Sequence, residues 1–232
     1  MRIWDIDPGY LNRGNLLGEH AEAHAAFTVL SEGRKGYSRH PETLRWRGRL
    51  AALAARHDRL VTEMTLRGYR HRSPMRYDGP VAWPTTYVDA PERQFELLAA
   101  KYREREPGRI PIPDHVQMLW AQHKYSVMAR DPASAHEIGA QVAADAYELS
   151  DLSQGLVQWL RRPVSQGGLR NALQHMWGYV NEWADGGQPE SLSEMLDCVR
   201  RLVAEHQVAY LLQSTALGEL GCWVDPRPEQ AT

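Results

Sequence analysis

The 232-residue sequence contains only two cysteines and two phenylalanines, and it has no long apolar run. Cys198 and Cys222 can form neither a disulfide framework nor a four-ligand zinc site, so we expect buried free thiols. A membrane-spanning helix needs about 20 consecutive apolar residues, whereas Arg, Glu or His interrupts the longest apolar runs in this chain. Charged residues at positions 2 and 5 are unlike the apolar core of a signal peptide. We therefore expect a cytoplasmic protein that does not engage membranes.

Strand-like alternation is also nearly absent, and apolar residues recur at helical spacing along most of the chain. Three prolines between residues 107 and 113 disfavour helix there and give a short, stiff linker. We predict an all-α protein with two helical domains, residues 1–106 and 114–228, joined by the linker 107–113. The expected helices cover residues 15–30, 50–66, 91–106, 114–130, 134–148, 150–162, 167–184, 190–205 and 207–218.

The formal charge of −2 conceals an uneven distribution along the chain. Residues 1–76 carry 14 Lys and Arg against 8 Asp and Glu, so the first third has a net charge of +6 and the remainder −8. Aromatic residues lie among these basic ones. Arginine matches phosphate oxygens and aromatic faces stack on bases, so the pattern is typical of a nucleic-acid surface. An ordinary solvated helical surface explains it equally well.

Residues 16–24 place four titratable side chains on one predicted helix. Glu19 and Glu22 are three apart and share one side, whereas His20 and His24 are four apart and share another. A carboxylate pair can serve acid/base chemistry, and a histidine pair at this spacing can hold a metal ion. Surface acids and hydrogen-bonded interface histidines are the simpler interpretations. The His-Glu-x-x-His pattern of zinc proteases is missing, and we expect no metal and no cofactor.

Several spaced motifs in the first third occur together and in order, at residues 1–4, 16–24, 56–64 and 67–74. With these motifs the chain resembles the pyrimidine-dimer DNA glycosylase family typified by phage endonuclease V, in its bacterial branch. The resemblance covers about residues 1–75 and extends more weakly to 106.

The resemblance implies a catalytic pair, the α-amine of Met1 and the carboxylate of Glu22. An α-amine ordinarily has a pKa of about 7.7–8.0, so a useful fraction of such groups is neutral and nucleophilic at cellular pH. The amine would displace the damaged base at C1′ and form a Schiff base, and loss of a C2′ proton would release the 3′ phosphate. Because a bulky Arg2 normally prevents removal of the initiator methionine, we expect the reactive amine on Met1 itself.

The implied function is that of a base-excision DNA glycosylase/AP lyase acting on damaged duplex DNA. Ala21 and Ala25 stand where the phage enzyme has arginines that grip the duplex, so the lesion is left open between pyrimidine dimers, abasic sites and other modified bases. The alternative is a non-catalytic nucleic-acid-binding or partner-binding protein that keeps the fold. We expect the site to be supported by Glu19, His20 and His24, and nucleic acid to be bound by Arg2, Arg13, Arg34, Lys35 and Arg39.

A second resemblance covers about residues 114–226, through motifs at 123–129, 171–179 and 225–228. This part is similar to a bacterial helical domain of unknown function that also occurs fused behind thiouracil desulfidases. One interpretation is an accessory domain in which His123, Lys124, Gln174 and His175 line a polar groove for a nucleotide or phosphate. The other, slightly favoured, is that His123 and His175 are buried and hydrogen-bonded across a helix interface.

Overall fold

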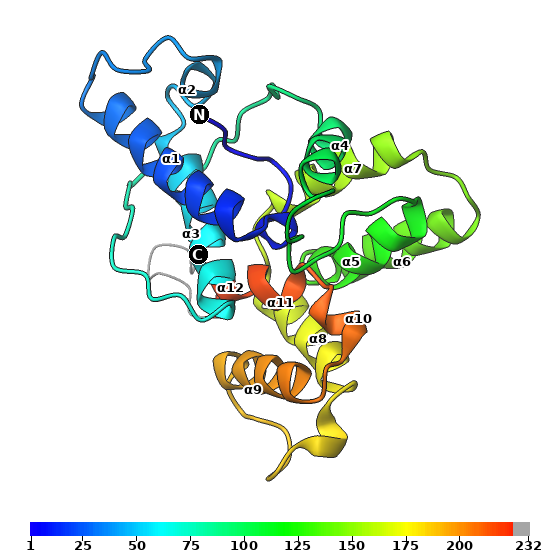
Figure 1. Ribbon diagram of the computed structural model, residues 1–232. Coiled ribbons are helices and arrows are strands. Elements are labelled where there is room, and N and C mark those ends of the chain that lie inside the picture. Colours follow the sequence, from blue (N-terminus) through cyan, green and yellow to red (C-terminus); the bar gives the residue numbers. More distant parts are fainter. Residues whose placement is uncertain (225–232) are drawn as a thin grey trace. The chain divides into compact units, whose positions relative to one another are not determined.

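The computed structural model describes residues 1–224, and these residues form helices and no β-strand (Figure 1). The prediction of an all-α protein is confirmed. The chain divides into two compact units, residues 1–108 and 109–232. The sequence motif at 225–228 lies outside the described residues. Within residues 1–224, no helix is both long and apolar enough to cross a membrane.

The first unit is built around two long helices, α1 and α3, which pack against each other. α1 begins where the Asn12 side chain accepts a hydrogen bond from the Asn15 N–H at 2.9 Å, an N-cap that satisfies one of the free amides of the first turn. α3 ends at Leu66, and Gly68, two residues later, has a positive φ of 81°, the usual conformation after a helix C-terminus. The helices of this unit are η1 (Pro8–Tyr10), α1 (Arg13–Ser31), α2 (Pro41–Arg45), α3 (Leu50–Leu66) and α4 (Pro91–Lys101).

At the end of the first unit, Gly108 lies against the backbone of Tyr10, near the beginning of the same unit. A Cβ atom on Gly108 would lie 2.3 Å from the Tyr10 carbonyl oxygen, so this close approach requires glycine. Between α3 and α4, residues 69–89 follow an irregular path, and the three prolines among them disfavour helix.

The second unit is organised around α5, which packs against α6, α7, α8 and α11. A buried ion pair between Arg130 and Glu219, 2.6 Å apart, joins the end of α5 to the closing helices. The helices of this unit are α5 (Val116–Met128), α6 (Pro132–Ala143), α7 (Leu149–Leu160), α8 (Gln166–Trp177), η2 (Asn181–Trp183), α9 (Leu192–Glu205), α10 (Ala209–Leu212), α11 (Ala216–Glu219) and α12 (Gly221–Val224).

Four of the predicted helices are shorter or more broken than expected. The helices predicted over 91–106 and 134–148 end at Lys101 and Ala143. The helix predicted over 167–184 ends at Trp177, and a turn leads into the 3-10 segment η2. The helix predicted over 207–218 is interrupted because the N–H of Thr215 donates to the Gln122 carbonyl of α5 at 2.8 Å instead of continuing the helix. The five-residue α2 was not predicted, since so short a helix has no measurable periodicity.

Candidate active site

The first seven residues form a non-helical segment with a bend at Asp5–Ile6, and buried side chains hold it in place. Gln94 of α4 binds both the backbone and a side chain of this segment. Its Oε1 accepts from the N–H groups of Asp5 (2.8 Å) and Ile6 (3.4 Å), and its Nε2 donates to Asp5 Oδ2 at 2.9 Å. Gln94 is 1% exposed. A buried side-chain amide whose oxygen and nitrogen both form hydrogen bonds fixes the position of the backbone that it binds.

Arg45 of α2 holds the same segment from another direction. Its Nη2 donates to the Ile3 carbonyl at 2.7 Å, and its Nη1 lies 3.0 Å from Asp5 Oδ1. Its Nε donates to Glu42 Oε1 at 2.5 Å. Burial alone would lower the pKa of Arg45, but the carboxylates of Asp5 and Glu42 outweigh this effect and raise the pKa.

A second buried arginine, Arg56 of α3, joins this segment to α1. Its Nε and Nη2 donate to the two oxygens of Glu19 at 2.7 and 2.9 Å, and its Nη1 donates to the Ile6 carbonyl at 2.8 Å. Glu19 also accepts from the Trp4 N–H at 3.2 Å. Burial raises the pKa of Glu19 and the Arg56 guanidinium opposes this shift. Glu19 is therefore committed to holding the structure together.

These contacts place the amino terminus beside Glu22, which lies one helical turn after Glu19 on α1. The α-amine nitrogen of Met1 lies 3.7 Å from Glu22 Oε1, and the backbone N–H of Arg2 donates to Glu22 Oε2. The Glu22 side chain is 36% exposed, whereas that of Glu19 is inaccessible. Glu22 thus contacts the amine and remains open to an incoming molecule.

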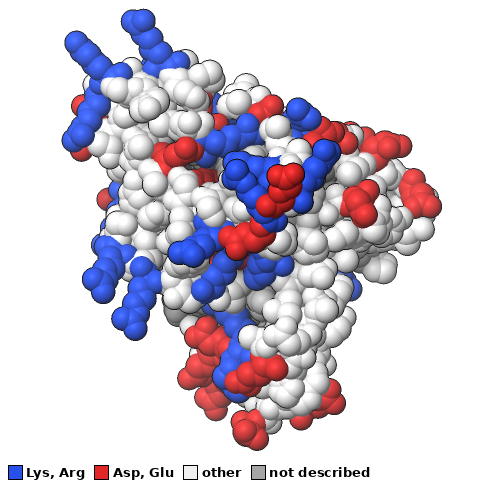
Figure 2. All heavy atoms as spheres, viewed as in Figure 1, with Lys and Arg blue, Asp and Glu red and all other residues white. Residues whose placement is uncertain are grey.

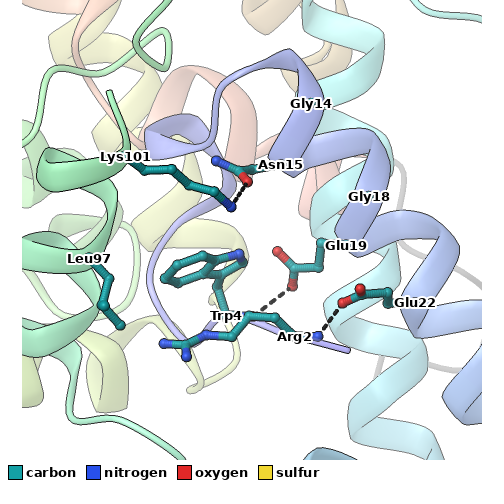
Figure 3. A pocket seen from close by; sticks show the side chains of 9 residues that line it. All are labelled: Arg2, Trp4, Gly14, Asn15, Gly18, Glu19, Glu22, Leu97 and Lys101. Carbon is teal, nitrogen blue, oxygen red and sulfur yellow. Dashed lines mark hydrogen bonds between the residues drawn. The ribbon is translucent and has the colours of Figure 1, made fainter. Parts of the chain in front are cut away.

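A cavity of about 570 Å³ adjoins this pair (Figure 3). Glu19 and Glu22 project toward it from the same side of α1, as their spacing predicts. The guanidinium of Arg2 lies 4.3 Å from the Trp4 ring centroid and 2.5 Å from Asp89 Oδ2. The wall is completed by glycine, Asn15 and two α4 residues; the full lining is Arg2, Trp4, Gly14, Asn15, Gly18, Glu19, Glu22, Leu97 and Lys101.

Of the predicted nucleic-acid contacts, Lys35 and Arg39 lie together, lining a hollow of about 680 Å³ with Tyr37, Ser38 and His40. Figure 2 shows Lys and Arg side chains projecting around this end of α1. The other predicted contacts do not join them. Arg2 lines the cavity beside Glu22, and Arg34 is exposed and pairs with Glu32 at 2.6 Å. Arg13 is exposed at the opposite end of α1, a 19-residue helix about 28 Å long at 1.5 Å per residue.

The two predicted supporting histidines lie elsewhere on α1. His20 and His24 do not line the cavity and instead contact His57 and His71. The sequence correctly predicts that the histidines and the glutamates occupy different sides of the helix, but it did not group His57 and His71 with them.

In the second unit the four predicted residues differ in exposure. His123 is buried, and its Nδ1 lies 2.9 Å from the Leu119 carbonyl of its own helix. Burial lowers the pKa of His123 to about 4. Lys124 is half-buried, while Gln174 and His175 of α8 are exposed. The expectation that His175 is buried across a helix interface is therefore wrong, since it lies on the exposed side of α8.

Two stretches of the chain match known families. Residues 1–77 match the family described as pyrimidine dimer DNA glycosylase. Residues 124–219 match a family described as a protein of unknown function (DUF1722). Both resemblances expected from the sequence are confirmed. No curated protein and no solved structure matches the chain. The first match supports a DNA glycosylase-like function at the family level, with DNA as the partner that such a family suggests.

Several residues of the candidate site were missed by sequence reasoning. Arg45 and Arg56 counted only as positive charge, although both are buried in ion pairs. Gln94 and Lys101 lie about 90 residues from their partners Asp5 and Asn15. No local pattern indicates such distant contacts. The regular spacing of Arg56 with the apolar residues of α3 was the one available signal, because it placed this arginine near the buried face.

We predict that Glu19→Ala destabilises the protein by about 3–5 kcal/mol, because the buried Arg56 would lose its compensating charge. Glu22→Ala, which removes a partly exposed carboxylate, should cost about 1 kcal/mol or less. Urea unfolding of both variants measures the difference. Equal losses would contradict the separate structural role assigned to Glu19.

Proposed function

We propose that the first unit is a DNA glycosylase/AP lyase that acts on damaged duplex DNA through a Schiff base on the α-amine of Met1. The 3.7 Å approach of that amine to Glu22, beside a cavity and within the matched residues 1–77, supports the proposal most strongly. A nucleophile within reach of a carboxylate that can accept protons is the arrangement that such chemistry needs.

In the proposed first step, the neutral amine forms a bond to C1′ of the damaged nucleotide. The C1′–N bond to the base breaks and the base leaves with its electron pair. Transfer of the amine proton and opening of the sugar ring then give the protonated Schiff base. Glu22 would stabilise the positive charge that develops on the sugar during this step.

In the second step, Glu22 removes a proton from C2′ and the C3′–O bond breaks, which expels the 3′ phosphate. The same carboxylate can serve both steps because it is partly exposed and contacts the amine directly. Glu19 is unsuitable, since both of its oxygens already accept hydrogen bonds from Arg56.

Access to C1′ requires that a nucleotide leave the duplex, at a cost of a few kcal/mol that is smallest for damaged or missing bases. The cavity of about 570 Å³ is within the size range of ligand pockets. Exposed basic residues of the first unit, Lys35 and Arg39 among them, would bind the phosphates. These features favour damaged duplex DNA as the substrate.

Lys101, which lines the cavity together with Glu22, is the rival nucleophile. Its Nζ donates to Asn15 Oδ1 at 2.8 Å. The α-amine is the better candidate of the two because it lies 3.7 Å from Glu22, whereas Lys101 Nζ is hydrogen-bonded to Asn15. Lys101→Ala provides a matched control.

Blocking the Met1 amine should abolish covalent trapping by borohydride on abasic duplex DNA, because an acetylated amine cannot form a Schiff base. Gel shift would compare covalent trapping by three proteins: the untagged protein, a protein that keeps an N-terminal extension, and the Lys101→Ala variant. Lys101→Ala should trap at close to the level of the unmodified protein. Full trapping by the blocked protein would contradict the mechanism.

Glu22→Gln should lower single-turnover cleavage by about 100-fold or more, the size expected for loss of general acid/base help. DNA affinity should change little, because the amide keeps the shape and its carbonyl oxygen still accepts hydrogen bonds. Cleavage within threefold of the wild type would show that another group handles the protons.

The double change Lys35→Ala and Arg39→Ala should weaken duplex binding and flatten the dependence of log K on log salt by about one unit for each phosphate that is no longer neutralised. The control is Arg201→Ala, an exposed arginine of the second unit that pairs with Glu205 at 2.8 Å. Fluorescence anisotropy over a range of salt concentrations measures both. An unchanged slope in the double variant would exclude the 35–39 hollow from the DNA interface.

A further inference from the structure

Four histidines from three separate parts of the first unit meet beside α1. His20 and His24 come from consecutive turns of α1, His57 from α3, and His71 from the irregular segment that follows α3. Their ring centroids lie 4.7–5.1 Å apart in the five closest pairs. One nitrogen of each ring can be chosen so that all four nitrogens lie within 4.8 Å of one another.

We propose that this four-histidine cluster binds one divalent transition-metal ion, with zinc as the best fit. Zinc prefers four ligands in a tetrahedron, with Zn–N distances of about 2.0–2.1 Å, which places the nitrogens about 3.3 Å apart. The Nε2 atoms of His20 and His57 are 3.2 Å apart. That pair already has the required spacing, and the widest pair would close by about 1.5 Å on binding.

The chemical state of the rings also suits a metal. Metal ions bind neutral imidazole. Burial, reinforced by the neighbouring histidines, lowers the pKa of His20 to about 4 and lowers the pKa of His24 and His71 as well. Among the described residues, the buried Nε2 of His24 has no hydrogen-bond partner. A metal ion would satisfy this nitrogen, whereas a network of hydrogen-bonded histidines leaves it unused.

Groups around the cluster can support metal ligands from outside. Histidine ligands usually donate their second N–H to a carboxylate or another polar group, which fixes the ring orientation. Asp58 Oδ1 lies 3.6 Å from His57 Nδ1, and Ser73 Oγ lies 3.4 Å from His71 Nε2. The first distance is too long for a hydrogen bond but short enough for the carboxylate to attract that N–H.

A bound ion would join α1, α3 and the segment after α3 at one point. Because all four ligands are protein side chains, no position stays open for a substrate, which indicates a structural ion. None of the four histidines lines the cavity next to Glu22. The ion would instead fix the position of α1, the helix that presents Glu22. This inference concerns metal binding and does not depend on the proposed Schiff-base chemistry.

The test uses untagged full-length protein, treated with a chelator, dialysed and titrated with ZnCl₂. Isothermal titration calorimetry should give one ion per chain. At a free zinc concentration about 100 times Kd, the melting temperature should rise by about 10 °C. Absence of stoichiometric binding by the wild-type protein would overturn the proposal.

His71→Ala is the main variant, because His71 is half-buried and lies outside the helices. It should weaken zinc binding at least tenfold and remove most of the thermal shift, and His20→Ala should do the same. The control is His136→Ala, an exposed histidine of α6, which should bind as the wild type does. Circular dichroism establishes that each variant is folded. Wild-type affinity in both cluster variants would place the ion elsewhere and overturn the proposal.

Discussion

The candidate site depends on the anchoring of the non-helical segment at residues 3–6. Chain termini normally fray, because few contacts hold them. In this protein Gln94, Arg45 and the Arg56–Glu19 pair bind the backbone of this segment from α4, α2, α3 and α1. A buried ion pair offsets its desolvation only when its geometry is good and its remaining groups are hydrogen-bonded. Arg56 and Glu19 meet this condition and hold the amino terminus in place.

α1 performs three separate tasks. Glu19 is buried and structural, Glu22 is half-exposed beside the Met1 amine, and His20 and His24 join a histidine cluster. A helical repeat of 3.6 residues places the glutamates on one side of α1 and the histidines on another within six positions. The two glutamates share a side but differ in burial, because Glu19 binds the buried Arg56 and Glu22 does not, so only Glu22 is available for chemistry.

Much of the fold and part of the site could be predicted from the sequence. Periodicity identified α1 and α3 and the two sides of α1 that carry carboxylates and imidazoles. Contacts between distant positions could not be predicted, such as Gln94 with Asp5, or the Thr215 bond to Gln122 that interrupts a predicted helix. The charge count overestimated the positive charge that is exposed to solvent, because Arg45 and Arg56 balance buried acids and do not face solvent.

Identifying the nitrogen that carries the DNA tests the central claim most directly. The reduced protein–DNA adduct formed on abasic duplex would be digested with nuclease and protease, and the modified peptide sequenced by mass spectrometry. The account predicts a single adduct on the α-amine of Met1, which lies 3.7 Å from Glu22. An adduct on Nζ of Lys101, an amine that lines the cavity, would contradict it.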